Sequence, residues 1–141
     1  MITRECVNLA NCICRTIMKI DRVQKKLECT SDRIITPIML FSKDFTPFIA
    51  FGNVGDVEDD CHGCFETSVF KVEDICKNSC CGKLSLLRPI DENGCLANSI
   101  CEIFRLEETD FCVEVDFHCF CAIQRLSMSL VNRPLGGIHP K

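Results

Sequence analysis

Four cysteines in the middle of the chain have a spacing that could hold a metal ion. Cys61 and Cys64 form a C-x-x-C pair, and Cys76 and Cys80 follow within the segment CKNSCC. Four thiolates in a tetrahedral arrangement are a common structural zinc site. A zinc ribbon usually has two C-x-x-C pairs, whereas three residues separate Cys76 from Cys80. The spacing therefore leaves zinc open as an alternative to free or paired thiols.

The C-x-x-C pair could also take part in thiol redox chemistry. A redox-active pair normally opens a helix, whose N-terminus lowers the pKa of the thiol. Cys64 instead leads directly into FETSVFKV, which has the pattern of a strand. With His62, His118 and His139 as the three histidines, no Cys/His or Ser/His signature for nucleophilic catalysis stands out. Glycine-rich phosphate loops are absent as well, so we expect no enzyme.

A second set of chemically active side chains lies in DFCVEVDFHCFCAIQ, which spans Asp110–Gln124. Every second residue there is apolar, which predicts a half-buried strand. Cys119 and Cys121 fall on the apolar side, so we expect them to be buried or paired within the subunit. The other side carries Cys112, Glu114, Asp116 and His118. Because neighbours on one side of a strand are about 7 Å apart, four such groups cannot share one ion, and we expect a solvated face.

The segment before the strands predicts an amphipathic helix over Thr3–Leu27. Its apolar residues recur at steps of three and four, which forms one stripe with basic residues opposite. The stripe consists of Cys6, Leu9, Ile13, Ile17, Ile20, Val23 and Leu27. Cys12 and Cys14 lie on the two flanks of this stripe, so neither is an obvious core residue.

After residue 32 the pattern changes to about six short apolar runs separated by turn residues, with no helical period between them. This predicts a mainly β fold, an antiparallel β-sandwich or barrel-like core preceded by the N-terminal amphipathic helix. We expect three regions: a cysteine-bearing helical arm over residues 1–30, a β-rich core domain over 31–126, and a mobile C-terminal tail over 127–141.

Composition limits the location and the partners. The chain has 14 cysteines among 141 residues, a density typical of disulfide scaffolds. Its start lacks the apolar run of a secretory signal, so we expect synthesis in a reducing cytosol, where disulfides are rare. The net charge of −4, with acids and bases mixed, favours neither nucleic acid nor an anionic membrane as a partner.

Several uncommon strings occur together and in order: FGNVG, CFETSVFKVE, LSLLRPID and LEETDFCVEVDFHCFCAIQ. Over roughly Phe51 to Asn132 the chain thereby closely resembles the spore coat protein Y and Z family of endospore-forming bacteria, which includes exosporium protein Y. Members of the family carry a further cysteine soon after CFCAIQ. Here the corresponding residue is Arg125, which puts a cross-link at that point in doubt.

The resemblance implies a structural protein of the spore coat, crust or exosporium, without enzymatic activity or cofactor. Family members are made in the mother cell, deposited on the forespore together with other coat proteins, and oxidised late. They assemble into hexamers that tile a two-dimensional, disulfide-cross-linked lattice. We therefore expect exposed thiols on the helix, the loops and the outward strand face to bond neighbouring subunits. These candidates are Cys6, Cys12, Cys14, Cys29, Cys61, Cys64 and Cys112. The alternative function is a cysteine-rich zinc-binding scaffold or interaction module.

Overall fold

The computed structural model describes residues 2–30, 33–53 and 64–135, with side chains from residue 12 onward. These residues form one long helix, seven strands and three short 3-10 turns. In chain order the elements are α1 (Ile2–Leu27), β1 (Ile38–Phe41), β2 (Ala50–Gly52), β3 (Phe65–Thr67), β4 (Phe70–Cys76), β5 (Cys81–Ile90), η1 (Ile100–Glu102), β6 (Arg105–Asp116), η2 (Phe117–Cys119), β7 (Ala122–Arg125) and η3 (Met128–Leu130). None of the helices in these ranges is long and apolar enough to cross a membrane.

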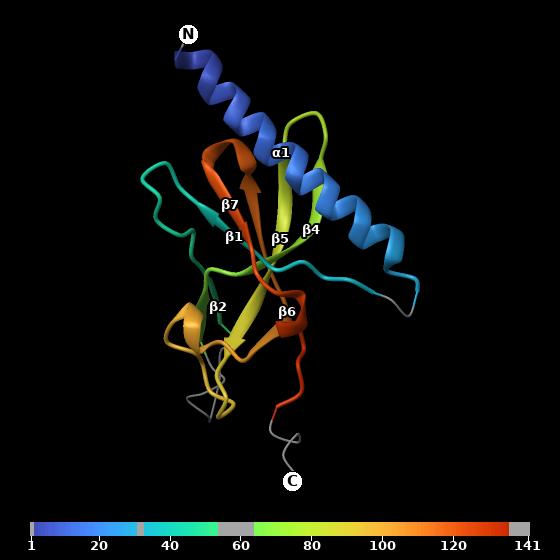
Figure 1. Ribbon diagram of the computed structural model, residues 1–141, viewed down its shortest axis with the longest axis vertical. Helices are drawn as coiled ribbons and strands as arrows, with labels where there is room; N and C mark the ends of the chain where they lie inside the picture. Colours follow the sequence, from blue (N-terminus) through green and yellow to red (C-terminus); the bar gives the residue numbers. More distant parts are fainter. Residues whose placement is uncertain (1, 31–32, 54–63, 136–141) are drawn as a thin grey trace.

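The predicted N-terminal helix is confirmed, and it crosses one end of the sheet (Figure 1). Ile13, Ile17 and Ile20 are buried against β4 and η2, which explains the apolar stripe. The described part of the stripe differs from our prediction at Val23, which is exposed, whereas Gln24 is buried in its place. The Gln24 side chain donates to the Val72 carbonyl at 2.8 Å and accepts from the Thr36 amide at 3.0 Å. The helix is therefore joined to β4 by hydrogen bonds as well as by packing.

The predicted antiparallel, mainly β fold is also confirmed. Five strands form one sheet in the order β6-β5-β4-β1-β7, and β2 pairs with β3 in a small second sheet. Every strand pair is antiparallel. The long hairpin of β5 and β6 forms the largest ladder, from Cys81↔Asp116 to Ile90↔Arg105.

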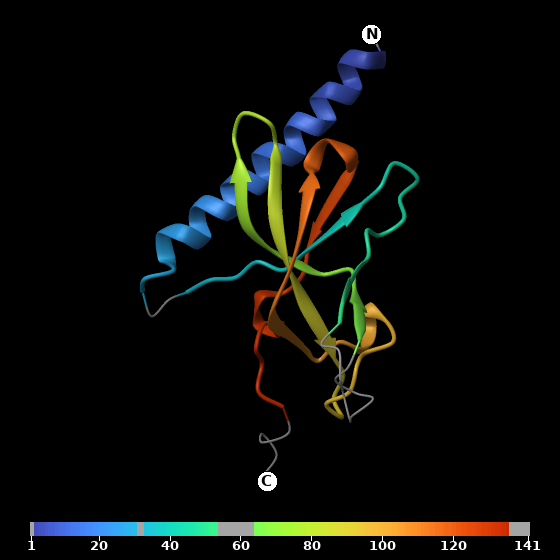
Figure 2. The same ribbon diagram turned by 180° about the vertical axis from the view of Figure 1, so that it is seen from behind.

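The sheet is curved, because its two edge strands are consecutive in the chain. Residues 117–121 alone connect the end of β6 with the start of β7 at the opposite edge. In a flat sheet the edge strands would be about 19 Å apart, since neighbouring strands are about 4.8 Å apart. Five residues that include a 3-10 turn reach only about 16 Å. The edges must therefore approach one another, and the views from both sides show this barrel-like curl (Figures 1 and 2).

Our prediction of one continuous strand over Asp110–Gln124 is wrong. The strand ends at Asp116, whose side chain accepts a hydrogen bond from the His118 amide at 2.9 Å and so caps η2. Phe117 is then turned into the core, where it is fully buried. The apolar alternation continues through this turn, so that periodicity alone does not reveal where the strand ends.

Alternate residues on the central strands face two separate cores. On β5, Leu86 belongs to the larger core, which lies under α1, and Leu87 belongs to the smaller one. The smaller core consists of Met39, Val69, Leu87 and Leu106. Burial on both faces explains why the strand sequences are continuously apolar.

The start of the expected mobile tail lies against the smaller core. Leu130 and Val131 pack on it, and the Asn132 amide donates to the Leu106 carbonyl at 2.8 Å. The guanidinium of Arg133 lies 3.9 Å from the centre of the Phe104 ring. Residues 127–133 therefore make specific contacts with the sheet. Residues 136–141 of that tail lie outside the described residues.

Candidate functional site

Cysteine thiols are unusually abundant in the protein, and the exposed ones are distributed over its surface. Nine cysteines in the described ranges are free, and eight of these are exposed. The exposed ones are Cys12, Cys29, Cys64, Cys76, Cys81, Cys101, Cys112 and Cys119. They belong to the helix, to loops, to a hairpin and to a strand face, so they do not converge on one catalytic centre. Such a distribution suits bonds to several neighbours.

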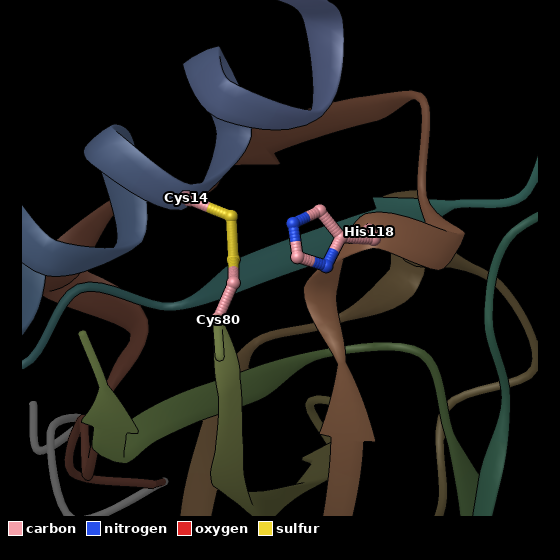
Figure 3. Close-up of side chains that lie close together, drawn as sticks. All are labelled: Cys14, Cys80 and His118. Atoms are coloured by element: carbon pink, nitrogen blue, oxygen red, sulfur yellow. A yellow bond between two sulfur atoms is a disulfide. The ribbon is translucent and has the colours of Figure 1, made fainter. Parts of the chain in front are cut away.

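One disulfide fixes the helix to the sheet. Cys14, on the buried side of α1, is bonded to Cys80 in the turn between β4 and β5, with Cα atoms 5.9 Å apart (Figure 3). We expected Cys14 to bond a neighbouring subunit, and the structure corrects this. Cys14 lies one position after Ile13 and three before Ile17, so the helical period turns it inward. Cys95 is disulfide-bonded as well.

The hairpin of β4 and β5 places two exposed thiols opposite each other. Cys76 and Cys81 are direct cross-strand partners at its closed end. Hydrogen bonds from the Ser79 side chain, and then from the Ser79 and Asn78 amides, hold the pKa of the Cys76 thiol below its usual value. Cys76 is therefore the more readily ionised and more reactive kind of thiol. It is not among the cross-linking candidates predicted from the sequence, although the turn sequence CKNSCC implies a hairpin that pairs Cys76 with Cys81.

The Cys112 thiol ionises less readily than the Cys76 thiol. It lies on the exposed face of the edge strand β6, together with Glu114 and Asp116. Partial burial, and then the negative charge of Glu73, raise the pKa of the Cys112 thiol. It is accessible to a neighbour, and its raised pKa leaves a smaller fraction of it ionised at neutral pH than of Cys76.

The two thiols that we expected in the interior differ from each other. Cys119 is exposed, because η2 turns the chain out of the strand alternation just before it. Cys121 is partly buried, and its thiol donates to the Ser42 carbonyl at 3.0 Å. Neither is paired in the structure.

The four cysteines with zinc-like spacing are not brought together among the described residues. Cys61 lies outside them, and Cys80 is bonded to Cys14. Cys64 directly precedes β3, and Cys76 ends β4. β3 lies at the end of the molecule near the C-terminus, whereas the β4–β5 turn lies against α1 at the other end (Figure 1). Cys61 is also one of the candidates for cross-links between subunits. Another of these candidates, Cys6, lies where α1 is described by its backbone alone.

The family model and the curated relative that match this chain both indicate one family of spore coat proteins. The family model described as "Spore coat protein Z" matches residues 2–128, which includes α1 as well as the sheet. The chain is 42% identical over 102 residues to spore coat protein Z of Bacillus subtilis (strain 168). That alignment covers 69% of this chain and 66% of the relative, so the chain spans slightly less than two thirds of the relative's length. No solved structure matches the chain.

Proposed function

Because the chain belongs to the spore coat protein Z family, we propose that its subunits assemble into a disulfide-cross-linked, two-dimensional array on the endospore. Its role is structural and its location is the spore coat. The observation that supports cross-linking is the set of eight exposed, free thiols, which are spread over several elements of the fold. A group distributed in this way offers bonds to several neighbours, whereas catalysis needs reactive groups gathered at one place.

We propose that the array is built from hexamers and belongs to the crust or exosporium. The protein is made in the mother cell and docks on other coat proteins, and the assembled array needs no cofactor, nucleic acid or membrane. A ring of six uses one head-to-tail contact, and contacts between rings then tile the plane. Each subunit needs two different surface patches for this arrangement.

Two separate apolar surfaces are available for these contacts. The first, which we call the β2 patch, consists of Ile49, Phe51 and Ile100, and Phe51 is 68% exposed. Ile49 and Ile100 line the same surface hollow. The second, the helix–tail groove, lies between Val23 of α1 and Met128 of η3, which are 46% and 53% exposed. We propose that a second copy of the chain covers each surface, since water-exposed apolar patches favour association.

Cross-linking then makes the array resistant. Contacts that are weak individually become strong when they are repeated, and the thiols on neighbouring subunits react at high effective concentration. Each disulfide between subunits makes their dissociation depend on reduction. We propose Cys12, Cys29, Cys64 and Cys112 for these bonds, together with Cys76 and Cys81 at the hairpin. Cys6 and Cys61 remain candidates outside the described side chains.

Isotope mixing tests whether bonds form between subunits. Light and 15N-labelled protein are mixed before assembly, the assembled material is oxidised, and free thiols are alkylated at acidic pH before digestion. Cross-linked peptides that join a light and a heavy chain at these cysteines are the expected result. The Cys14–Cys80 peptide serves as the internal control, since it should join chains of one label only. If every disulfide, like this control, joined chains of one label only, cross-linking between subunits would be excluded.

A further inference from the structure

Beside the disulfide lies a third metal-ligating side chain that the proposed function does not use. The sulfurs of Cys14 and Cys80 and a ring nitrogen of His118 all lie within 4.8 Å of one another. The three residues come from α1, the β4–β5 turn and η2, so the fold itself brings them together. Figure 3 shows the imidazole ring beside the sulfur pair, with one nitrogen directed toward it.

The orientation of His118 is fixed from the other side of its ring. Nδ1 lies 2.9 Å from a carboxylate oxygen of Asp116, and the same oxygen accepts the His118 backbone amide at 2.9 Å. With Nδ1 held by Asp116, Nε2 is the nitrogen that faces the sulfurs. In zinc sites, a carboxylate commonly accepts a hydrogen bond from one nitrogen of a histidine ring while the other nitrogen binds the metal.

We infer that the protein binds one Zn²⁺ ion in its reduced state, through the thiolates of Cys14 and Cys80 and Nε2 of His118, with water in the fourth position. Binding releases two protons, because two thiols become two zinc-bound thiolates. Zinc–sulfur bonds of about 2.3 Å place two thiolates about 3.8 Å apart in a tetrahedral site. A disulfide holds its sulfurs about 2.05 Å apart, so they need to separate by only about 1.7 Å.

The surroundings suit a site that can be filled from solvent. Cys14 and Cys80 are 7% and 6% exposed, whereas the His118 side chain is 47% exposed. The sulfurs are thereby shielded, and the ion has an entry path past the imidazole. This ligand set shares only Cys80 with the four-cysteine set that the sequence spacing predicts.

Zinc and the disulfide are alternatives, because both use the same two sulfurs. Either one connects α1 to the β4–β5 turn. A low-molecular-weight disulfide such as oxidised glutathione would convert one state into the other. The two zinc-bound thiolates give two electrons to the disulfide bond of the oxidant, which breaks to leave two thiolates. The Cys14–Cys80 bond forms at the same time, and Zn²⁺ is released. The metal would thus keep these two thiols from pairing with the other cysteines until oxidation. The zinc site does not depend on the array.

Cobalt binding tests this site. The full-length protein is reduced with a phosphine without oxygen and titrated with Co²⁺, whose visible bands report tetrahedral thiolate ligation, and Zn²⁺ is then added as competitor. Other thiols also bind cobalt, so the readout is the difference between variants. We expect Cys14→Ser and Cys80→Ser to lose the binding of one equivalent of Co²⁺. His118→Asn and Asp116→Asn should lower the affinity for that equivalent at least tenfold. Cys112→Ser and Cys101→Ser are the matched controls and should bind as the parent does.

His118→Asn and Asp116→Asn keep both cysteines, so their oxidised forms show by circular dichroism whether the fold is intact. Oxidation of the parent protein should release the same equivalent of metal. The inference is overturned if the reduced parent binds no cobalt, if the oxidised parent keeps that equivalent, or if the variants at positions 14, 80, 116 and 118 bind as the controls do.

Discussion

Cys14 of α1 is covalently joined to Cys80, which occupies the left-handed region with a φ of 61° in the turn before β5. The sequence separation between them is 66 residues, so that one bond closes a loop of nearly half the chain. Cys80 is held in this conformation by its own amide, which donates to the Cys76 carbonyl at 2.9 Å. The turn therefore directs Cys80 toward the helix and leaves Cys76 and Cys81 exposed.

Removal of this disulfide should lower the free energy of unfolding. A closed loop of this length restricts the unfolded chain, and we expect Cys14→Ser to cost about 2–4 kcal/mol in urea denaturation of the oxidised protein. Cys112→Ser, which removes an exposed free thiol, should change the value by less than about 0.5 kcal/mol. Equal stability of the two variants would show that the bond does not constrain the chain.

The Cys76 thiol should be alkylated faster than the Cys112 thiol near neutral pH. Hydrogen bonds from Ser79 lower the pKa of Cys76, whereas burial raises the pKa of Cys112, so the thiolate fractions differ. The ratio of their rates with iodoacetamide, followed by mass spectrometry in monomeric protein, should be high at neutral pH, where the Cys112 thiol is mostly protonated. It should fall as the pH rises and both thiols ionise.

Ser79→Ala should reduce this ratio, because it removes the largest cause of the lowered pKa of Cys76. The alkylation rate of Cys112 is the internal control. An unchanged Cys76 rate in this variant would contradict the role of Ser79.

Gln24 should contribute to stability through its two buried hydrogen bonds. Gln24→Ala leaves the Val72 carbonyl and the Thr36 amide without these partners, which we expect to cost about 1–3 kcal/mol. Lys26→Ala on the exposed side of α1 is the matched control, with an expected change below about 0.5 kcal/mol. Urea denaturation measures both. A Gln24 variant as stable as the control would mean that packing alone holds the helix.

Glu108 should make part of the stability depend on pH. Its carboxylate binds both terminal nitrogens of Arg33, at 3.1 and 3.0 Å, and accepts from Asn132 at 2.7 Å. Burial by itself would raise the pKa of Glu108, but the hydrogen bonds from Arg33 and Asn132 and the charges of Arg33 and Lys71 hold it below its usual value. A carboxylate with a lowered pKa in the folded state stabilises the protein above its unfolded pKa of about 4.3. That contribution is lost as the pH falls through the lower, folded-state pKa.

Glu108→Gln should therefore lower the free energy of unfolding by about 1 kcal/mol at pH 7. The difference from the parent should shrink at pH values below about 4. There the parent carboxylate becomes protonated, and it is then uncharged like the glutamine side chain of the variant. Glu114→Gln on the same strand is the control for a lost exposed carboxylate. A difference that stays constant from pH 7 to pH 3 would contradict the ion pair with Arg33.

The sequence predicted the helix, the antiparallel sheet and the family, because these depend on local periodicity and on uncommon strings. It did not predict that Gln24 replaces Val23 on the buried face, since hydropathy ignores a partner such as the Val72 carbonyl. It also missed the end of β6 at Asp116, because Phe117 remains apolar while it turns into the core.

The thiols were the hardest part to predict. A pattern of cysteines does not specify which of them pair, and the bond between Cys14 and Cys80 depends on α1 crossing the β4–β5 turn. The convergence of His118 on that bond depends on the η2 turn, which the strand alternation conceals. The activation of Cys76 by Ser79 could have been expected, because a serine three residues on within a tight turn is close to the thiol.

Electron microscopy of the protein expressed without other coat proteins tests the proposed array most directly. Negatively stained samples are compared before and after a strong thiol reductant, each with and without denaturant. We predict hexagonally ordered sheets that withstand the denaturant until the reductant is added, since apolar contacts order the array and disulfides fix it. Dispersed small particles under all these conditions would contradict the array.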